Sequence, residues 1–171
     1  MKTAKVIVLP YNKAWKTEFE QIKGELLDAI GDLIIDIEHV GSTSVEGMSA
    51  KPCIDIDVVI KDYSVFDDIV LRLGGIEYIH EGDIGIKDRE AFKYDGKEHL
   101  QKHHLYVCPL YSTELRRHTL FRDFLKSDPE AIQKYSLVKE TAAKLFPDDF
   151  DKYIEYKSPC IQELYEKYGL K

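Results

Sequence analysis

The chain has 171 residues, with 31 acidic and 24 basic side chains, so its formal net charge is −7 at neutral pH. This length suits one well-buried domain over residues 1–171, and the acidic balance argues against generic nucleic-acid binding. The apolar run at residues 6–9 is too short for a signal peptide or a membrane span. We therefore expect a cytoplasmic protein without a membrane partner.

The first predicted element is a helix over residues 12–30. Its apolar side chains recur every three or four residues, Asn12 suits an N-cap, and Gly31 follows the last helical position. Trp15 lies on the apolar stripe, so we interpret it as a packing residue rather than a base-stacking residue. Residues 33–40 are rich in β-branched side chains and predict a strand that ends at a turn.

That turn carries three hydroxyl groups in a row. Gly41 readily adopts the backbone angles of a sharp turn, and Ser42, Thr43 and Ser44 follow it directly. Hydroxyl and backbone N–H donors after a strand are suited to holding phosphate oxygens. Taken alone, however, such a segment is also an ordinary Gly/Ser loop.

Residues 54–60 alternate apolar side chains with Asp55 and Asp57, which predicts a strand with one buried face. Both carboxylates then project from the other face, where they can hold two divalent metal ions. Acidic residues on a strand can also simply protect a sheet from aggregation. The combination of this pair with the hydroxyl-bearing turn favours nucleotidyl transfer more than either part does.

The remaining elements are predicted from caps and alternation. A capping box at Ser64 opens a helix that ends at residues 74–75, and strands follow over residues 76–80, 84–94 and 103–110. The last third is predicted to be helical: Ser112 caps a helix to about residue 126, Asp128-Pro129 opens a second, and Ser158-Pro159 opens a third to residue 168.

The three cysteines are interpreted as inert buried thiols. They are far apart, lack metal-type Cys-x-x-Cys spacing and stand in strand-like or apolar surroundings; they are Cys53, Cys108 and Cys160.

Four further side chains are candidates for the site, each with a simpler alternative. His104 is predicted on the same strand face as Tyr106, where it can serve as a metal ligand or general base, or form only a cross-strand hydrogen bond. Arg89 can clamp a phosphate or pair with a neighbouring acidic residue. Lys51 can neutralise triphosphate charge or be a solvated loop residue. Arg122 can contact phosphate or acceptor, or form a surface ion pair.

The run from residue 39 to residue 57, with its Gly-Ser-Thr-Ser turn and Asp-Ile-Asp strand, resembles the signature block of the GrpB family, part of the nucleotidyltransferase superfamily. Nearly the whole chain is covered, because the resemblance extends to residues 11–15, residues 120–125, Pro129, Tyr135, Lys139, Tyr153 and Lys157. It implies an α+β fold with a mixed, largely antiparallel sheet flanked by helices. It also implies a nucleotide-phosphate site at Gly41 and Ser42, and Mg²⁺ or Mn²⁺ at the two aspartates.

One departure from the superfamily pattern bears on activity. Superfamily members commonly supply a third carboxylate from a later strand, and residues 103–110 contain no acidic residue. The leading hypothesis is transfer of a nucleoside monophosphate from an NTP to an unknown small-molecule or protein hydroxyl. The alternative is a non-catalytic nucleotide- or phosphate-binding module. A third hypothesis is a phosphodiesterase or phosphatase that uses the same metal pair, but the His/Asp metal-ligand clusters usual in such enzymes are not evident in the sequence. The nucleotide, the acceptor and the oligomeric state are not determined by the sequence.

Overall fold

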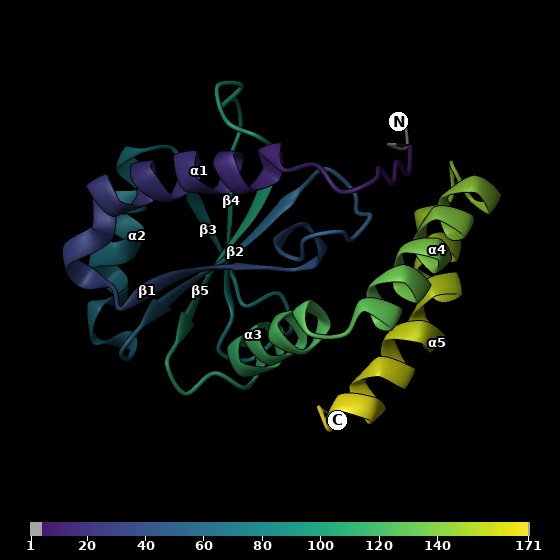
Figure 1. Cartoon of the computed structure of the whole chain (residues 1–171). Coiled ribbons are helices and arrows are strands. Elements are labelled where there is room, and N and C mark those ends of the chain that lie inside the picture. Colours follow the sequence, from purple (N-terminus) through teal and green to yellow (C-terminus); the bar gives the residue numbers. More distant parts are fainter. Residues whose placement is uncertain (1–4, 171) are drawn as a thin grey trace.

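The computed structural model describes residues 5–170, which form a five-stranded sheet covered by helices (Figure 1). The strands are β1 (Asp36–Val40), β2 (Ile54–Ile60), β3 (Ile79–Gly82), β4 (Glu90–Lys93) and β5 (His103–Pro109), in the spatial order β1-β2-β5-β4-β3. The β2/β5 pair is parallel, and the pairs β1/β2, β4/β5 and β3/β4 are antiparallel. The predicted α+β class, with a mixed and largely antiparallel sheet, is confirmed.

The helices are α1 (Ala14–Ile30), α2 (Phe66–Gly75), α3 (Thr113–Lys126), α4 (Pro129–Leu145) and α5 (Phe150–Tyr168). Single 3₁₀ turns occupy Gly31–Leu33, Ser42–Ser44 and Tyr63–Val65. Helices α1 and α2 lie on one side of the sheet, α3 lies on the other, and α4 and α5 pack together beside it (Figure 1). Within residues 5–170, no helix has the length and apolar character needed to cross a membrane.

The main core lies between the sheet and helices α1 and α2. Its centre is the apolar face of β2, whose four alternating side chains are fully buried: Ile54, Ile56, Val58 and Ile60. They share this core with the predicted stripe of α1, namely Trp15, Phe19, Ile22, Leu26 and Ile30. Each such side chain contributes about 1.5–3 kcal/mol when buried. The alternation of β2 therefore directs Asp55 and Asp57 to the opposite face, and the packing role of Trp15 is confirmed.

One predicted helix start was displaced by two residues, and another was wrong. Helix α1 begins at Ala14 rather than at residue 12, although the Asn12 Oδ1 atom does accept the Ala14 N–H at 2.9 Å. Ser64 is not the cap before α2, because the Asp62 carboxylate accepts the Ser64 N–H and opens a 3₁₀ turn first. In both cases a nearby Asx side chain captured the amide two residues later.

Three predicted strands were too long. The predicted strand over residues 33–40 loses its start to the 3₁₀ turn that ends α1, so β1 begins at Asp36. The next, over residues 76–80, is instead Ile79–Gly82, because Ile76 is the C-cap of α2 and Glu77 has a φ of +74°. Of residues 84–94 only Glu90–Lys93 pair, because positive φ angles at Ile84, Gly85 and Asp88 turn the preceding chain out of the sheet.

The C-terminal helices follow two of the three predicted caps. The side chains of Ser112 and Asp128 accept the N–H groups of Leu115 and Ala131, each at 3.2 Å. The third prediction was wrong: α5 begins at Phe150 with Asp149 as its N-cap, and Pro159 lies inside the helix. The Ser158 hydroxyl donates to the Ile154 carbonyl instead of capping a helix.

Candidate functional site

Asp55 and Asp57 leave β2 on the face that is turned towards α3. Asp57 is completely buried, whereas the Asp55 side chain is 35% exposed. The two carboxylates therefore meet different surroundings: Asp57 faces a helix, and Asp55 faces open cavities. Residues 54–60 thus carry both predicted carboxylates on one face, as the alternation predicted.

Asp57 is held by a histidine of α3. The His118 Nδ1–H donates to Asp57 Oδ2 at 2.7 Å, and the His118 Nε2 atom lies 3.1 Å from Glu114 Oε1. Burial lowers the pKa of His118, but hydrogen bonds to both carboxylates outweigh that effect and raise the pKa to about 9. A charged imidazole therefore bridges Asp57 and Glu114 at neutral pH and fixes the orientation of the buried carboxylate.

The second oxygen of Asp57 tests whether this site suits a metal ion. Asp57 Oδ1 is buried, and no hydrogen-bond donor among the described residues reaches it. A buried carboxylate oxygen without a partner costs free energy unless it binds a cation. Carboxylate oxygens are also the preferred ligands of Mg²⁺. Asp57 therefore fits the metal ion that the fold implies.

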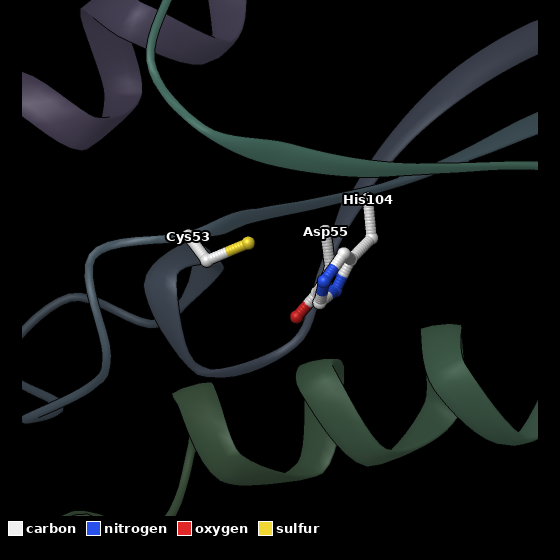
Figure 2. Close-up of side chains that lie close together, drawn as sticks. All are labelled: Cys53, Asp55 and His104. Atoms are coloured by element: carbon white, nitrogen blue, oxygen red, sulfur yellow. The ribbon is translucent and has the colours of Figure 1, made fainter. Parts of the chain in front are cut away.

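Asp55 lies in a second cluster, with His104 and Cys53 (Figure 2). The parallel register of β2 and β5 sets Asp55 beside His104, and the His104 Nδ1–H donates to Asp55 Oδ1 at 3.0 Å. This bond, together with one to Cys53, raises the pKa of His104 to about 10. In this arrangement His104 is a protonated hydrogen-bond donor to Asp55 at neutral pH, and its predicted role as a metal ligand or general base stays a prediction.

Gly41 brings the turn against Asp55. Its φ is +74°, and a Cβ atom added there would overlap Asp55 Oδ2. Only glycine satisfies both conditions, because other residues rarely adopt a positive φ and all of them carry a Cβ. The predicted turn and the predicted carboxylate are thus in van der Waals contact.

The three hydroxyls of the turn have different partners. The Thr43 hydroxyl is buried and bonds His39 Nε2 at 2.9 Å, and the Ser44 hydroxyl donates to the Gly41 carbonyl. Ser42 Oγ instead accepts from Lys139 Nζ at 2.7 Å and also bonds the Tyr135 side chain. Ser42 lines two cavities beside Asp55, so its hydroxyl is the best placed of the three to meet a ligand, and the other two support the turn.

Ser42 borders a cavity of about 170 Å³ that has an unusual concentration of lysines. Lys51, Lys139 and Lys157 line it together with Cys53, Asp55 and His104, and these six are joined by Thr43, Ala50 and Tyr153. Burial lowers the pKa of all three lysines, to about 8 at Lys157 and well below the usual value at Lys139. Asp55 offsets part of this burial at Lys51 and Lys157, and Glu140 does so at Lys139, but burial still dominates, and a bound phosphate would offset more of it.

The lysine side chains are held in place by aromatic rings. Lys51 Nζ lies 4.5 Å from the centre of the Phe150 ring, and Lys139 Nζ lies 4.2 Å from that of Tyr135. Lys51 is therefore packed rather than a solvated loop residue. Cation–π contacts of this kind are worth about 0.5–2 kcal/mol each.

A neighbouring cavity of about 350 Å³ opens on the α3 side of Asp55. Ser42, Asp55 and Lys157 line both cavities, and the second adds His118, Phe121, Arg122 and Tyr165 among others. Arg122 donates to Glu38 and to the His39 carbonyl, besides pairing with Asp123 at 2.9 Å. The predicted surface ion pair of Arg122 is thus present, with Asp123, but the pairing with Glu38 anchors its guanidinium at the edge of the cavity. A larger cavity of about 620 Å³ lies on the other side of β1, and neither Asp55 nor Asp57 lines it.

Strand β5, next to β2, carries an aromatic residue at the position beside Asp57, where a third carboxylate would be expected from the superfamily pattern. Tyr106 of β5 is paired with Asp57 in the sheet register. The guanidinium of Arg89 lies 4.2 Å from the Tyr106 ring centre, and its Nε is buried without a partner among the described residues. Arg89 precedes β4 instead of lying on it, and its main contact is this ring rather than the predicted ion pair with an adjacent carboxylate.

The sequence places this protein among known relatives. A model of the family described as GrpB protein matches residues 5–167. The chain belongs to the GrpB family. It is 32% identical over 164 residues to the glutamate-rich protein GrpB of Alkalihalophilus pseudofirmus, covering 93% of each chain. It is 31% identical over 158 residues to the protein YqkA of Bacillus subtilis, covering 92% of this chain but only 46% of YqkA, so it spans about half the length of that relative.

Solved structures place the GrpB fold in a wider group. The crystal structure of GrpB from Enterococcus faecalis has a TM-score of 0.80 at 29% identity, covering 95% of this chain and 99% of that one. The Cid1 poly(U) polymerase, in a mutant form bound to MgATP, has a TM-score of 0.57 at 9% identity, covering 79% of this chain and 44% of that one. The family thus shares the nucleotidyltransferase fold.

Sequence reasoning missed several side chains of this site. Cys53 was interpreted as inert, yet it lies two residues before Asp55, and the period-two alternation that located the aspartates also directs Cys53 to their face. Glu114 and His118 are spaced i, i+4, so a shared helix face was readable from the sequence. That this face meets Asp57 was not readable, because it depends on how α3 crosses the sheet.

Proposed function

We propose that this GrpB-family protein is a metal-dependent nucleotidyltransferase-like enzyme, which transfers a nucleoside monophosphate from an NTP to a hydroxyl of a small molecule or a protein. One observation carries the proposal: Asp55 and Ser42 border the same two cavities, next to a buried Asp57 oxygen that has no partner. A carboxylate pair beside a hydroxyl-bearing, cationic cavity is suited to a metal-bound triphosphate.

Each residue has a role in this proposal. Asp55 and Asp57 would hold Mg²⁺ or Mn²⁺, and such an ion supplies charge neutralisation on the reacting phosphate. The Ser42 hydroxyl and the ammonium groups of Lys139 and Lys157 would bind the leaving diphosphate. His118 holds Asp57 in a fixed orientation through its hydrogen bond to Oδ2, so it is a positioning residue.

The basic side chains around the two cavities complete the proposed binding site. Lys51 would add charge on the diphosphate side, since it lines the cavity of 170 Å³. Arg122, at the edge of the 350 Å³ cavity, would face the acceptor or an outer phosphate oxygen. Arg89 would act indirectly, because its guanidinium lies 4.2 Å from the centre of the Tyr106 ring and holds that ring in position.

A second candidate function is a nucleotide- or phosphate-binding module without catalysis. It is favoured by Tyr106, because an aromatic ring stands opposite Asp57 where superfamily enzymes commonly place a third carboxylate. The lysine cavity would bind phosphates equally well without metal chemistry.

Calorimetry with a panel of NTPs, with and without Mg²⁺, separates these functions, and diphosphate release measures turnover. The enzyme requires Mg²⁺-dependent binding and release of diphosphate, both lost in Asp57→Asn and retained in Asp28→Asn, a matched change of an exposed aspartate on α1. Metal-independent binding without diphosphate release would support the module. Full turnover by an Asp55→Ala/Asp57→Ala double variant would refute the enzyme assignment, and absence of any nucleotide binding would refute both.

A further inference from the structure

The cluster of Cys53, Asp55 and His104 has a donor set that Mg²⁺ does not require. It combines one sulfur, one carboxylate oxygen and one imidazole nitrogen, and the three ligand atoms all lie within 4.8 Å of one another. Figure 2 shows the Cys53 sulfur directed towards the other two side chains. Among the described residues it is the one group of three or more such side chains close enough to share an ion.

We propose that Cys53, Asp55 and His104 bind a zinc ion, a function that goes beyond the proposed nucleotidyl transfer and does not depend on it. Cysteine sulfur, imidazole nitrogen and carboxylate oxygen are the usual protein ligands of Zn²⁺. Thiolate ligands select Zn²⁺ and similar ions, whereas Mg²⁺ prefers sites made of oxygen alone. The chemistry of the donors therefore distinguishes this ion from the one proposed at Asp57.

The geometry needs little adjustment. Tetrahedral coordination at the usual Zn–S, Zn–N and Zn–O distances sets the ligand atoms roughly 3.3 to 3.8 Å apart. The observed limit of 4.8 Å is therefore within about 1 Å of that requirement, a movement that side-chain rotation can supply. The His104 side chain is 50% exposed and that of Asp55 is 35% exposed, so neither is locked by packing.

Three protein ligands leave the fourth coordination position of the zinc ion open, and this position faces a lysine-lined cavity. The cluster lines the 170 Å³ cavity with Lys51, Lys139 and Lys157, so an ion bound there has room for a water molecule or an anion as its fourth ligand. Binding releases protons, because the Cys53 thiol and the His104 ring nitrogen that ligates the ion must both be deprotonated. The charges then balance, because the thiolate and the carboxylate offset the ion, and the lysines favour an anionic fourth ligand. An open fourth position is the arrangement of zinc sites that exchange ligands rather than of sealed structural ones.

Zinc at this position has a consequence for Asp55. A carboxylate committed to the zinc ion is withdrawn from the pair that the proposed enzyme would use. If the proposed function holds, Zn²⁺ therefore inhibits it by competing for Asp55. Excess Mg²⁺ does not reverse this inhibition, because Mg²⁺ does not replace Zn²⁺ on the Cys53 thiolate.

Cobalt titration of the purified full chain tests the site without any nucleotide, so its outcome is independent of the proposed function. Co²⁺ should give a sulfur-to-metal charge-transfer band in the near ultraviolet, saturating at one equivalent, bleached by Zn²⁺ and unchanged by excess Mg²⁺. Cys53→Ser should abolish the band and weaken Zn²⁺ binding by more than about 10-fold, the low end of the cost of losing even an outer-shell partner. The matched control Cys160→Ser, which changes a buried thiol of α5 outside the cluster, should retain both.

His104→Ala provides a second variant, since the half-exposed His104 side chain can be removed without disturbing the core. The variant should keep the circular dichroism spectrum of the wild type and lose Zn²⁺ affinity to a similar extent as Cys53→Ser. The proposal is overturned if no charge-transfer band forms, if the band survives in folded Cys53→Ser, or if Mg²⁺ displaces Co²⁺.

Discussion

The lysine-lined cavity predicts that Lys157→Met makes the protein more stable while it weakens phosphate binding. Burial and repulsion by Lys51 lower the pKa of Lys157 from 10.5 to about 8. The charged form is therefore disfavoured in the folded protein relative to the unfolded chain. Methionine has a similar reach and carries no charge, so the substitution should remove this penalty and keep most of the packing.

The size and sign of the effect follow from linkage. At about 1.4 kcal/mol for each pH unit between the two pKa values, the penalty at neutral pH is about 3 kcal/mol, and we expect about 2 kcal/mol because Lys157 is only partly enclosed. Below pH 8 the lysine is protonated in both states, so the full penalty applies. Between about pH 8 and 10.5 the unfolded chain binds more protons, so the wild-type protein gains stability as the pH rises and the advantage of the variant disappears.

Urea unfolding at neutral pH and at about pH 10 measures both the gain and its disappearance. Lys152→Met is a matched control on the same helix, because its side chain is 62% exposed and should shift the free energy of unfolding by less than about 0.5 kcal/mol. Calorimetry with inorganic triphosphate should show weaker binding for Lys157→Met and unchanged binding for the control. A variant that is less stable than wild type at neutral pH, with the expected circular dichroism spectrum, would refute the conclusion that burial makes the Lys157 charge unfavourable in the folded protein.

Two further predictions concern the residues that hold the aspartates. Gly41→Ala should destabilise the fold by at least about 1–2 kcal/mol, because alanine must adopt a φ of +74° and its Cβ displaces Asp55. A shift of the urea midpoint measures this loss, and an unchanged midpoint would contradict the contact between Gly41 and Asp55. His118→Gln should cost about 3 kcal/mol at neutral pH, because Asp57 is left as a buried charge without a cation, and adding Asp57→Asn should recover part of that loss. Strictly additive losses in the double variant would contradict their pairing.

The parts of the fold that the sequence predicted well are those in which one local pattern determines the structure. The alternation over residues 54–60 has only one arrangement that buries four apolar side chains, so the strand and the direction of its aspartates followed directly. Ser112 and Asp128 were correct as caps because each directly precedes a helical pattern, and its side chain accepts the N–H three residues later.

The failures arose where local signals competed. Pro159 was interpreted as a helix start, but Asp149 caps the same helix earlier, and packing retains the proline inside it. The strand predicted over residues 84–94 was shortened because Asp88 and its neighbours adopt positive φ angles that propensity does not reveal.

The candidate site was predicted in its local parts and missed in its tertiary ones. The turn and the aspartate pair lie within twenty residues of one another, so spacing alone joined them. The contacts of His118 with Asp57 and of Lys139 with Ser42 depend on the packing of α3 and α4, which no local pattern encodes.

The sequence separations of these contacts have a consequence for how the protein folds. Asp55 meets His104 across 49 residues, Asp57 meets His118 across 61, and Ser42 meets Lys139 across 97. Closing such loops costs entropy before the contacts repay it, so the parallel β2/β5 pair and the docking of α3 and α4 should form late on the folding pathway. A ribosome-bound nascent chain that has emerged only through β2 would carry both aspartates and the Gly41 turn, yet lack His104 and His118, whose side chains bind them. Ligand-dependent protection of the two aspartates should therefore appear only after the last helices have been synthesised.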